Sequence, residues 1–237
     1  MCSGYSKTGA LADYCLAEEK TTAALPASVA AADAASMPVV ALTALQQLHG
    51  FKAGESALVI GASGGVGSVA VQIAKALGAS RVAAVCSASN AAFVKSLGAD
   101  EVVDYAVGDE AMIAALSKKP FDRIVDAVTS PTDKDYWPIS SAVVAPTGTT
   151  VAINGGIGMM TAMLYMFTGL QLQSPRARTI VCVPNAPELT QLVDWMAAGK
   201  LKAAIADTFP LDETAVTDGY ARLEARRVKG KLVCKVA

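Results

Sequence analysis

The chain has 237 residues, of which 53% are hydrophobic and 17% are charged, so it can bury a substantial core and is not a disordered sequence. Its 20 basic and 21 acidic residues nearly cancel, which excludes the strong positive field by which proteins collect nucleic acid. Five cysteines without a CxxC pair, and a single histidine, His49, predict neither a disulfide framework nor a metal site. We therefore expect a protein of a reducing compartment inside the cell.

The first segments predict one strand and one helix. Residues 10–18 alternate loosely between apolar and polar side chains, which favours a strand. The alanine-rich stretch from Pro26 to Pro38 leads into a helix that ends near His49 and Gly50. Because no basic segment followed by an apolar core and a cleavage site begins the chain, a secretory signal is not expected.

From residue 56 onward, strands and helices alternate. Short apolar runs predict the strands, and segments of helical periodicity predict the helices between them. The predicted strands are 56–60, 81–86, 101–103, 121–128, 149–153 and 179–183, and the predicted helices are 65–77, 90–97, 109–116 and 187–198. This alternation predicts an α/β fold, a doubly wound parallel sheet covered by helices on both faces.

Two further stretches complete the chain. From Tyr136 to Pro175 there is no charged residue, but prolines and glycines interrupt the stretch, which favours two buried elements and a loop over a membrane span. After a break at Pro210, where the chain leaves the main domain, residues 211–226 predict an amphipathic helix and residues 231–236 a strand.

A glycine-rich loop lies between the strand 56–60 and its helix. The sequence GASGGVG at 61–67 is a form of the dinucleotide-binding fingerprint, in which exposed backbone N–H groups at a positive helix terminus receive a diphosphate. The alternative is a purely structural strand-to-helix turn. The position after a strand and before a helix favours cofactor binding by Ala62, Ser63, Gly64, Gly65, Val66 and Gly67.

The end of the second strand bears on which dinucleotide binds. NAD binders place an acidic residue there for the ribose 2′-hydroxyl, whereas no acidic residue occurs from Val82 to Ala99. Ser87, Ser89 and Asn90 offer hydroxyl and amide groups that donate to a 2′-phosphate. We therefore expect NADP(H) to be preferred, with NAD(H) as an alternative; these residues are equally suited to a solvated turn that caps the next helix.

Several motifs carry a resemblance to a known family. The stretches GESALVIGASGGVGSVAVQIAKALGA and FVKSLGADEVVDY, with GALADYCLAEEKTTAALP, ALTALQQL, VAINGG and GKLVCKV, resemble the medium-chain dehydrogenase/reductase superfamily. The similarity is strongest to its zinc-independent quinone oxidoreductase group, which includes plant alkenal and enone reductases and organelle-associated members. The resemblance implies the cytoplasm by default, with a chloroplast or mitochondrion as alternatives.

The resemblance also implies roles for single residues. Val40 stands where zinc-dependent relatives have a ligand cysteine, three residues before the threonine that matches Thr43, so no metal is expected. NADPH-dependent relatives meet the 2′-phosphate with a basic residue at the position of Asn90, a tyrosine matching Tyr105 and an arginine matching Arg226. Two of the three are kept here, and the basic residue is not.

A third motif of the resemblance lies after the strand 149–153. Asn154, Gly155 and Gly156 match the loop beside the nicotinamide, although a simple strand-end turn would explain the same residues. Tyr136, Tyr165 and Asn154 could polarise a substrate oxygen, but packing or capping explains each of them as well. No catalytic residue is assigned.

The resemblance implies a domain arrangement with one departure. Relatives begin with a GroES-like domain, and this chain matches only the end of it. We expect residues 1–25 to be a remnant of that domain, 26–204 the dinucleotide-binding Rossmann domain and 205–237 the returning segment of the catalytic domain. The alternative is that Met1 is not the true start.

These observations favour an NADP(H)-dependent oxidoreductase that transfers hydride to a quinone or an α,β-unsaturated carbonyl. The alternative is an inactive nucleotide-binding subunit or scaffold in a larger assembly. Its motivation is the uncharged, methionine-rich segment 157–172, although the same residues favour a buried core helix with adaptable methionine packing. Self-association through that segment, or through an edge strand at 179–183, is expected under either hypothesis.

Overall fold

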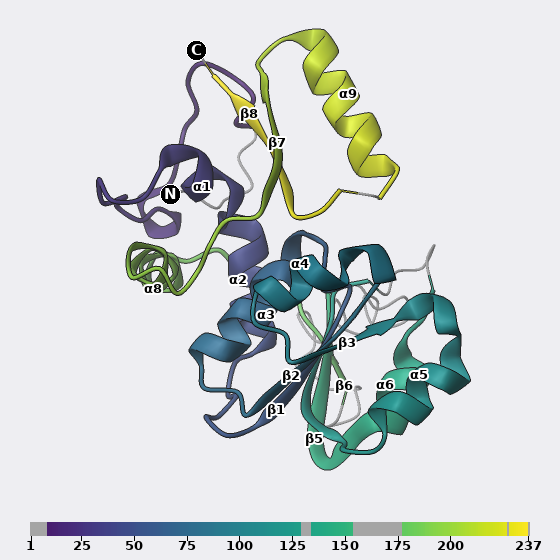
Figure 1. Cartoon of the computed structure of the whole chain (residues 1–237). Helices are drawn as coiled ribbons and strands as arrows, with labels where there is room; N and C mark the ends of the chain where they lie inside the picture. The colour runs from purple at the N-terminus through teal and green to yellow at the C-terminus, as the bar shows by residue number, and fades with distance from the viewer. Residues whose placement is uncertain (1–8, 129–133, 154–176, 227, 237) are drawn as a thin grey trace, which may run out of the picture. The chain divides into compact units, whose positions relative to one another are not determined.

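The computed structural model describes residues 9–128, 134–153, 177–226 and 228–236 (Figure 1). Their contacts separate the chain into two compact units, each described by itself: unit 1 comprises Met1–Leu42 and Cys182–Ala237, and unit 2 comprises Thr43–Val181. This division places residues 26–42 and 182–204 in the same unit as both chain ends. The three-domain division after residues 25 and 204 stays a prediction.

The described part of unit 2 is built on a six-stranded parallel sheet with the order β3-β2-β1-β4-β5-β6. From β1 the chain runs outward to β2 and β3 and then crosses back to β4 on the other side of β1, and open α/β sheets bind ligands at the carboxyl edge beside such a reversal. The strands are β1 Ser56–Ile60, β2 Arg81–Cys86, β3 Glu101–Asp104, β4 Phe121–Asp126, β5 Val144–Ala152 and β6 Ala177–Thr179. The prediction of a doubly wound parallel sheet is confirmed.

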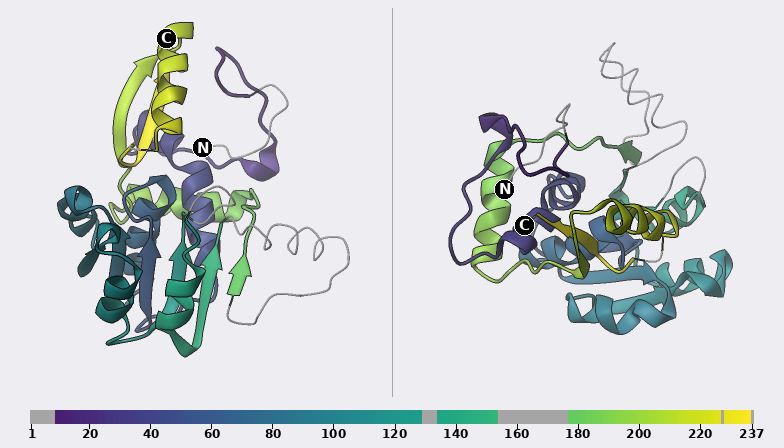
Figure 2. Two further views of the ribbon diagram at one scale, coloured as in Figure 1. Left: turned by 90° about the vertical axis from the view of Figure 1, so that its right-hand side faces the viewer. Right: turned by 90° about the horizontal axis from the view of Figure 1, so that it is seen from above.

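Helices cover both faces of this sheet (Figure 2). α3, Gly65–Ala76, and α4, Ala91–Ser96, follow β1 and β2 and lie on one face. α5, Asp109–Leu116, and α6, Trp137–Val143, follow β3 and β4 and lie on the other. There α5 and α6 contribute to a buried apolar cluster with the central strands, whose members include Leu58, Ile60, Val85, Met112, Leu116, Phe121, Ile124, Ile139 and Val143. Burial on both faces explains why the strands are apolar runs without polar alternation.

The carboxyl end of α2, Pro38–Gln47, is anchored to the sheet by two polar side chains. Gln47 is fully buried, and its Nε2 atom donates to the carbonyl oxygens of Asp126 at 3.1 Å and Val151 at 2.8 Å. Arg123 on β4 donates in turn to the carbonyl oxygens of Gln47 at 2.6 Å and His49 at 3.2 Å. These contacts satisfy carbonyl groups that a helix end leaves without partners, and they join α2 to β4 and β5.

Unit 1 contains a β-α-β element near the end of the chain. β7, Ile205–Pro210, and β8, Lys231–Lys235, pair in parallel and are joined by α9, Glu213–Glu224. A side chain at Gly219 would come within 2.9 Å of the Phe209 ring, so the glycine lets α9 pack closely on β7. The unit also contains α1, Ala31–Ser36, and α8, Ala186–Ala197, whose first turn is capped by the side chain of Asn185.

The strands predicted at 121–128 and 149–153 are β4 and β5 with different limits, and two other predicted strands differ more from the structure. Residues 10–18 form no strand, because among the described residues no strand pairs with them, and the alternating Tyr14 and Leu16 are 92% and 82% exposed. The strand predicted at 179–183 is β6, which ends at Thr179. Its partner β5 ends at Ala152, whose carbonyl oxygen accepts a hydrogen bond from Ile180 N–H, so β6 ends beside the end of β5.

These differences bear on the predicted self-association surfaces. β6 is the outermost strand of the described sheet, but only Thr179 of the predicted edge 179–183 belongs to it. The other predicted surface, 157–172, lies outside the described residues. Self-association therefore stays a prediction. In the part of the chain that the structure describes, no helix is both long and apolar enough to cross a membrane.

Candidate cofactor-binding site

The glycine-rich loop lies at the carboxyl end of β1, as the sequence predicts. Gly61 has a φ of +78°, and an added Cβ there would overlap Cγ2 of Val128, so only glycine fits this turn. The N–H groups of Gly61 and Ala62 both donate to the carbonyl oxygen of Val85 at 3.0 Å. The loop is thus held against the end of β2, while the fully buried Ala62 anchors it in the core.

The loop turns directly into α3. A Cβ on Gly67 would overlap the carbonyl oxygen of Gly61 and lie 2.7 Å from Cα of Ala62, so the first turn of the helix approaches β1 as closely as a backbone allows. Gly64 is the residue that precedes the helix, and among the described residues no side chain caps this helix end. The N–H groups of the first turn of α3 are therefore available to an anion, and the helix dipole favours one there.

The end of β2 lies beside this loop. The Asn90 carboxamide nitrogen donates to the hydroxyl of Ser63 at 3.0 Å, and the hydroxyls of Ser87 and Ser89 lie 3.0 Å apart. Oδ1 of Asn90 is covered from solvent and accepts no hydrogen bond from the described residues. The structure therefore brings Asn90 into contact with the glycine-rich loop, with Ser87 and Ser89 next to it in the same segment, and one polar atom of Asn90 lacks a partner among the described residues.

Tyr105 lies at the same edge of the sheet, one strand further out. It opens the short turn Tyr105–Val107 after β3, where Asp104 pairs in register with Cys86 at the end of β2. Its side chain is 49% exposed.

Tyr136, which could polarise a substrate oxygen, is buried. Burial, followed by the charges of Asp126, Tyr105 and Asp109, raises the pKa of Tyr136 to about 12. The Tyr136 phenol is therefore protonated at neutral pH, and its 5% exposure matches a packing role.

Two groups of predicted site residues stay untested. Asn154, Gly155 and Gly156 lie outside the described residues. Arg226 belongs to unit 1, where it follows α9 with a φ of 53°, a left-handed conformation that is uncommon for arginine. Its role toward the 2′-phosphate stays a prediction.

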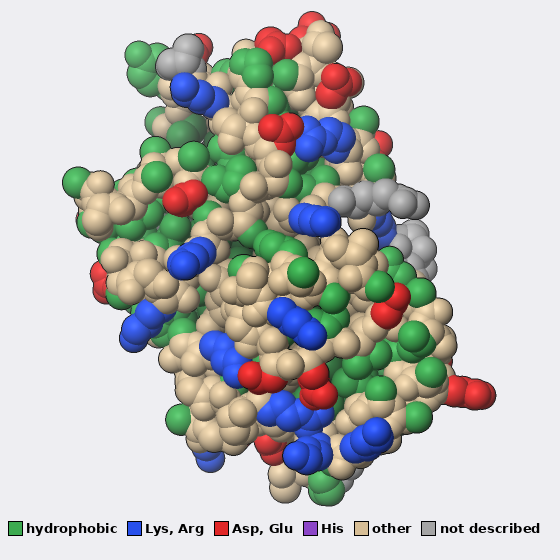
Figure 3. Space-filling model, viewed as in Figure 1, with side chains coloured by type: hydrophobic (Ala, Val, Ile, Leu, Met, Phe, Trp, Pro, Cys, Tyr) green, Lys and Arg blue, Asp and Glu red, His purple; other side chains and the backbone are tan. Residues whose placement is uncertain are grey.

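Charges and possible metal ligands are dispersed over the described residues. On the face in Figure 3, Lys and Arg side chains are interspersed with Asp and Glu side chains. Ion pairs such as Lys75–Asp100 at 2.7 Å and Arg81–Glu101 at 2.5 Å match this pattern. Within the described ranges, no three His, Cys, Asp or Glu side chains gather as metal ligands would. The prediction of a metal-free protein stays a prediction.

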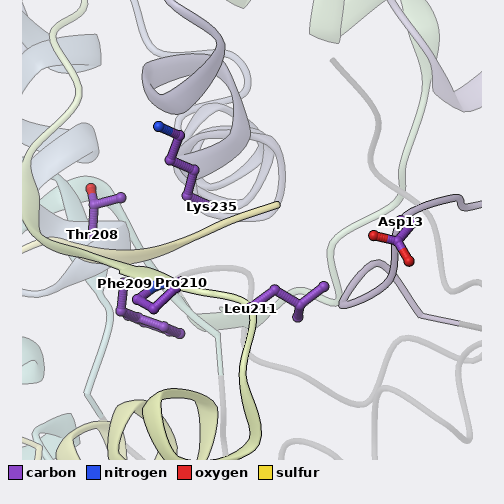
Figure 4. Close-up of a pocket in the computed structure, with 6 residues that line it drawn as sticks. All are labelled: Asp13, Thr208, Phe209, Pro210, Leu211 and Lys235. Atoms are coloured by element: carbon purple, nitrogen blue, oxygen red, sulfur yellow. The ribbon is translucent and has the colours of Figure 1, made fainter. Parts of the chain in front are cut away.

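Unit 1 has a separate surface hollow of about 480 Å³ (Figure 4). It lies at the carboxyl ends of β7 and β8 and is lined by Asp13, Thr208, Phe209, Pro210, Leu211 and Lys235. The charged members, Asp13 and Lys235, are both exposed. This lining offers apolar contact and exposed charge, but no buried polar group that would define a ligand.

Comparison with known proteins decides the family. A family model described as a zinc-binding dehydrogenase matches residues 97–234. The chloroplastic quinone-oxidoreductase homolog of spinach, Spinacia oleracea, is 34% identical over 233 residues, which are 95% of this chain and 68% of that protein. The chain belongs to the medium-chain dehydrogenase/reductase superfamily.

Other members of the superfamily show similar coverage. The mitochondrial NAD(P)H oxidoreductase RTN4IP1 of Mus musculus is 33% identical over 254 residues, covering 97% of this chain and 62% of its own length. The structure of the quinone oxidoreductase from Coxiella burnetii matches with a TM-score of 0.72 and 29% identity, over 90% of this chain and 63% of that one. The chain thus spans less than two thirds of the length of each of these two relatives.

Some residues of the site were not found from the sequence. Asp126 ends β4 with 2% exposure, and its Oδ1 accepts the N–H of Val128 at 2.9 Å, in the turn that packs on Gly61. The available signal was an acidic residue closing an apolar strand. Because that strand was predicted to run to Val128, the turn and its contact with the loop were missed.

Proposed function

We propose that this member of the superfamily binds NAD(P)H with a preference for NADP(H). We further propose that it is an oxidoreductase that acts on a quinone or an α,β-unsaturated carbonyl. The observation that carries the proposal is the uncapped end of α3, with its glycine turn at the carboxyl edge of β1. A diphosphate at this helix end would accept from backbone N–H groups and face the positive end of the dipole.

The residues present fit a dinucleotide. Gly61 and Gly67 have no room for a Cβ, so the glycines bring the loop and the helix into the close packing that such a site needs. Ser63, Ser87, Ser89 and Asn90 supply hydroxyl and amide groups beside the loop. The names of the spinach, mouse and Coxiella relatives support a nicotinamide cofactor and a quinone substrate.

The chemistry divides between cofactor and protein. A bound nicotinamide supplies the hydride, so the chain needs no nucleophile or triad of its own. The α3 terminus holds the diphosphate and the β2 end holds the adenosine ribose, which together fix the cofactor at two points and restrict its orientation. Tyr136 keeps its proton at neutral pH but is buried, so we assign it no proton transfer.

The preference for NADP(H) is supported by the absence of acidic residues from 82 to 99, since a carboxylate there would repel a 2′-phosphate. We further propose an intracellular, reducing compartment. The chloroplast and the mitochondrion, named for the spinach and mouse relatives, are candidates beside the cytoplasm.

Direct binding tests the proposal. Titration of the full chain with NADPH and with NADH, followed by nicotinamide fluorescence, should give saturable binding with the lower Kd for NADPH. Assays of NADPH oxidation with quinones and with enones, on this chain and on a version extended by a GroES-like domain of a relative, then test the reaction. If neither dinucleotide binds, the cofactor assignment is refuted. If a dinucleotide binds but neither protein oxidises NADPH with these substrates, the proposed reductase activity is refuted.

A further inference from the structure

Ser63 and Asn90 connect the glycine-rich loop, residues 61–67, to the segment that follows β2. Asn90 ends the 3-10 turn Ala88–Asn90, and its Nδ2 atom lies 3.0 Å from the Ser63 hydroxyl oxygen. The two residues are 27 apart in the sequence. They meet only because β1 and β2 are parallel neighbours, so that both strands end at the same edge of the sheet.

The opposite end of the same carboxamide is unmatched. Oδ1 of Asn90 is shielded from solvent, yet none of the described residues donates a hydrogen bond to it. Buried polar atoms in folded proteins nearly always have a partner. The lack of a donor to Asn90 Oδ1 beside the glycine-rich loop therefore points to a hydrogen bond that a bound ligand would complete.

A serine hydroxyl can hold an amide in either of two orientations, because it donates one hydrogen bond and also accepts. When Nδ2 donates to Ser63, the free end of Asn90 is an oxygen, which suits a ribose 2′-hydroxyl as donor. After a half-turn of the amide, Ser63 donates to Oδ1, and the free end is an NH₂ group, which suits the oxygens of a 2′-phosphate. Both orientations keep the contact with Ser63.

The segment around the end of β2 carries no charged side chain that would outweigh the Asn90 carboxamide in selecting a ligand. From Val82 to Val94, the chain carries no charged side chain, so this segment itself offers the ribose neither a carboxylate nor a cation. The Asp104 carboxylate belongs to the neighbouring strand β3, in register with Cys86. On this segment, the neutral Asn90 side chain donates a hydrogen bond to the loop. Its orientation is therefore the variable that distinguishes the two ligands on this side of the site.

We infer that Ser63 is a positioning residue that holds the Asn90 carboxamide against the adenosine ribose in either orientation, so that one site accepts both NADPH and NADH. This inference rests on the proposed function, because it requires a dinucleotide bound at the carboxyl edge of the sheet. It narrows the cofactor preference to a modest one, with the two Kd values within about tenfold of each other, because a single neutral hydrogen-bonding group does the discriminating.

The test measures the Kd of NADPH and of NADH for the full chain and for four variants. Asn90→Asp offers acceptors only and a negative charge, so it should raise the Kd of NADPH by about tenfold or more while changing that of NADH by less than about threefold. Asn90→Lys should shift the ratio the other way. Ser63→Ala should weaken both cofactors several-fold, and Ser63→Thr, which keeps the hydroxyl, should restore them.

A double variant separates positioning from a general structural effect. In the Ser63→Ala background, Asn90→Asp should shift the ratio of the two Kd values less than it does in the wild-type chain, because the side chain is no longer held. Ser96→Ala is the matched control: its hydroxyl donates to Phe93 O on α4 outside the site, and both Kd values should stay unchanged. Thermal unfolding of each variant verifies that it is folded.

The outcomes distinguish the two proposals. If the wild-type chain binds neither dinucleotide, the proposed function fails. If it binds them but Asn90→Asp changes both Kd values equally, or Ser63→Ala leaves the effect of Asn90→Asp undiminished, the inference about this pair is wrong while the proposed function stands. A ratio of Kd values far above tenfold in the wild-type chain would also overturn it.

Discussion

Gly67 in the first turn of α3 lies directly against the backbone of Gly61, with no room for a single additional carbon between helix and strand. Gly67→Ala should force the two elements apart and destabilise the protein by about 1–3 kcal/mol, as overpacking of a core contact does. Thermal or urea unfolding measures this change. A variant as stable as the wild type would show that the contact is looser than described.

Gly64 provides the contrasting case in the same loop. A Cβ at this position would lie 3.4 Å from the Gly61 carbonyl oxygen, an ordinary contact, and its φ of −81° suits any residue. Gly64→Ala should therefore retain the stability of the wild type but raise the Kd of NADPH by about tenfold, because a side chain would then stand where we propose that the main chain receives a diphosphate. Unchanged affinity in this variant would argue against binding at this turn.

Gln47 should matter more for stability than its neighbour Gln46. Gln47→Leu removes two buried hydrogen bonds, to the carbonyl oxygens of Asp126 and Val151. We expect a loss of about 1–2 kcal/mol in the free energy of unfolding, because these bonds are lost while the Asp126 carbonyl oxygen keeps the hydrogen bond from Ile153 N–H. Gln46→Leu at a partly exposed position should cost less than about 1 kcal/mol, and urea unfolding of both variants compares them.

Asp100 should make stability depend on acidity. Burial opposes its ionisation, but the hydrogen bonds from Lys75 and from Val82 N–H, with the nearby positive charges, lower its pKa in the folded state. A lowered folded pKa contributes stability that is fully present above the unfolded value of about 3.9 and is lost as the pH falls through the folded value.

Asp100→Asn should therefore flatten the decline of stability with acid below about pH 4. The loss at neutral pH should stay below about 1 kcal/mol, because the pair is partly exposed to solvent. Lys75→Met should reproduce part of the effect. Unfolding by urea at a series of pH values measures it, and identical pH profiles for Asp100→Asn and the wild type would contradict the assignment.

Two cysteines should differ in reactivity. Burial, and then the charge of Asp104, raise the pKa of the Cys86 thiol, whereas Cys15 lies exposed on unit 1. Because the thiolate is the reactive form, iodoacetamide at pH 8 should label Cys15 well before Cys86. Mass spectrometry of the labelled peptides compares the two, and urea should remove the difference. Equal rates in the folded protein would mean that the end of β2 opens readily.

Local patterns in the sequence were sufficient for most of unit 2. The runs 56–60 and 81–86 coincide with β1 and β2, because strands buried on both faces are apolar throughout and end where polar or glycine residues begin. The helix at 109–116 was likewise predicted residue for residue. The glycine loop was recognisable for the same reason, since a tight turn and a close helix approach both demand glycine in the chain itself.

Elements that depend on a partner were harder to predict. β7 was missed, and β6 was placed two residues late, because a strand's limits are set by the strand beside it: β6 ends where Ala152 ends β5. The short helix Trp137–Val143 was not separated from the uncharged stretch around it. Alternation at 10–18 suggested a strand, yet without a neighbour to pair with, its apolar side chains stay exposed.

The sequence by itself determined the order of strands and helices from β1 to β4, the glycine turn and the lack of an acidic residue after the second strand, because each of these is a local property of the chain. Only the tertiary structure decided that Ser63 contacts Asn90 and that one amide atom is left unmatched. It also decided that Gln47 bridges β4 and β5. Such contacts join residues far apart in sequence, and they exist because parallel strands bring their ends to one edge.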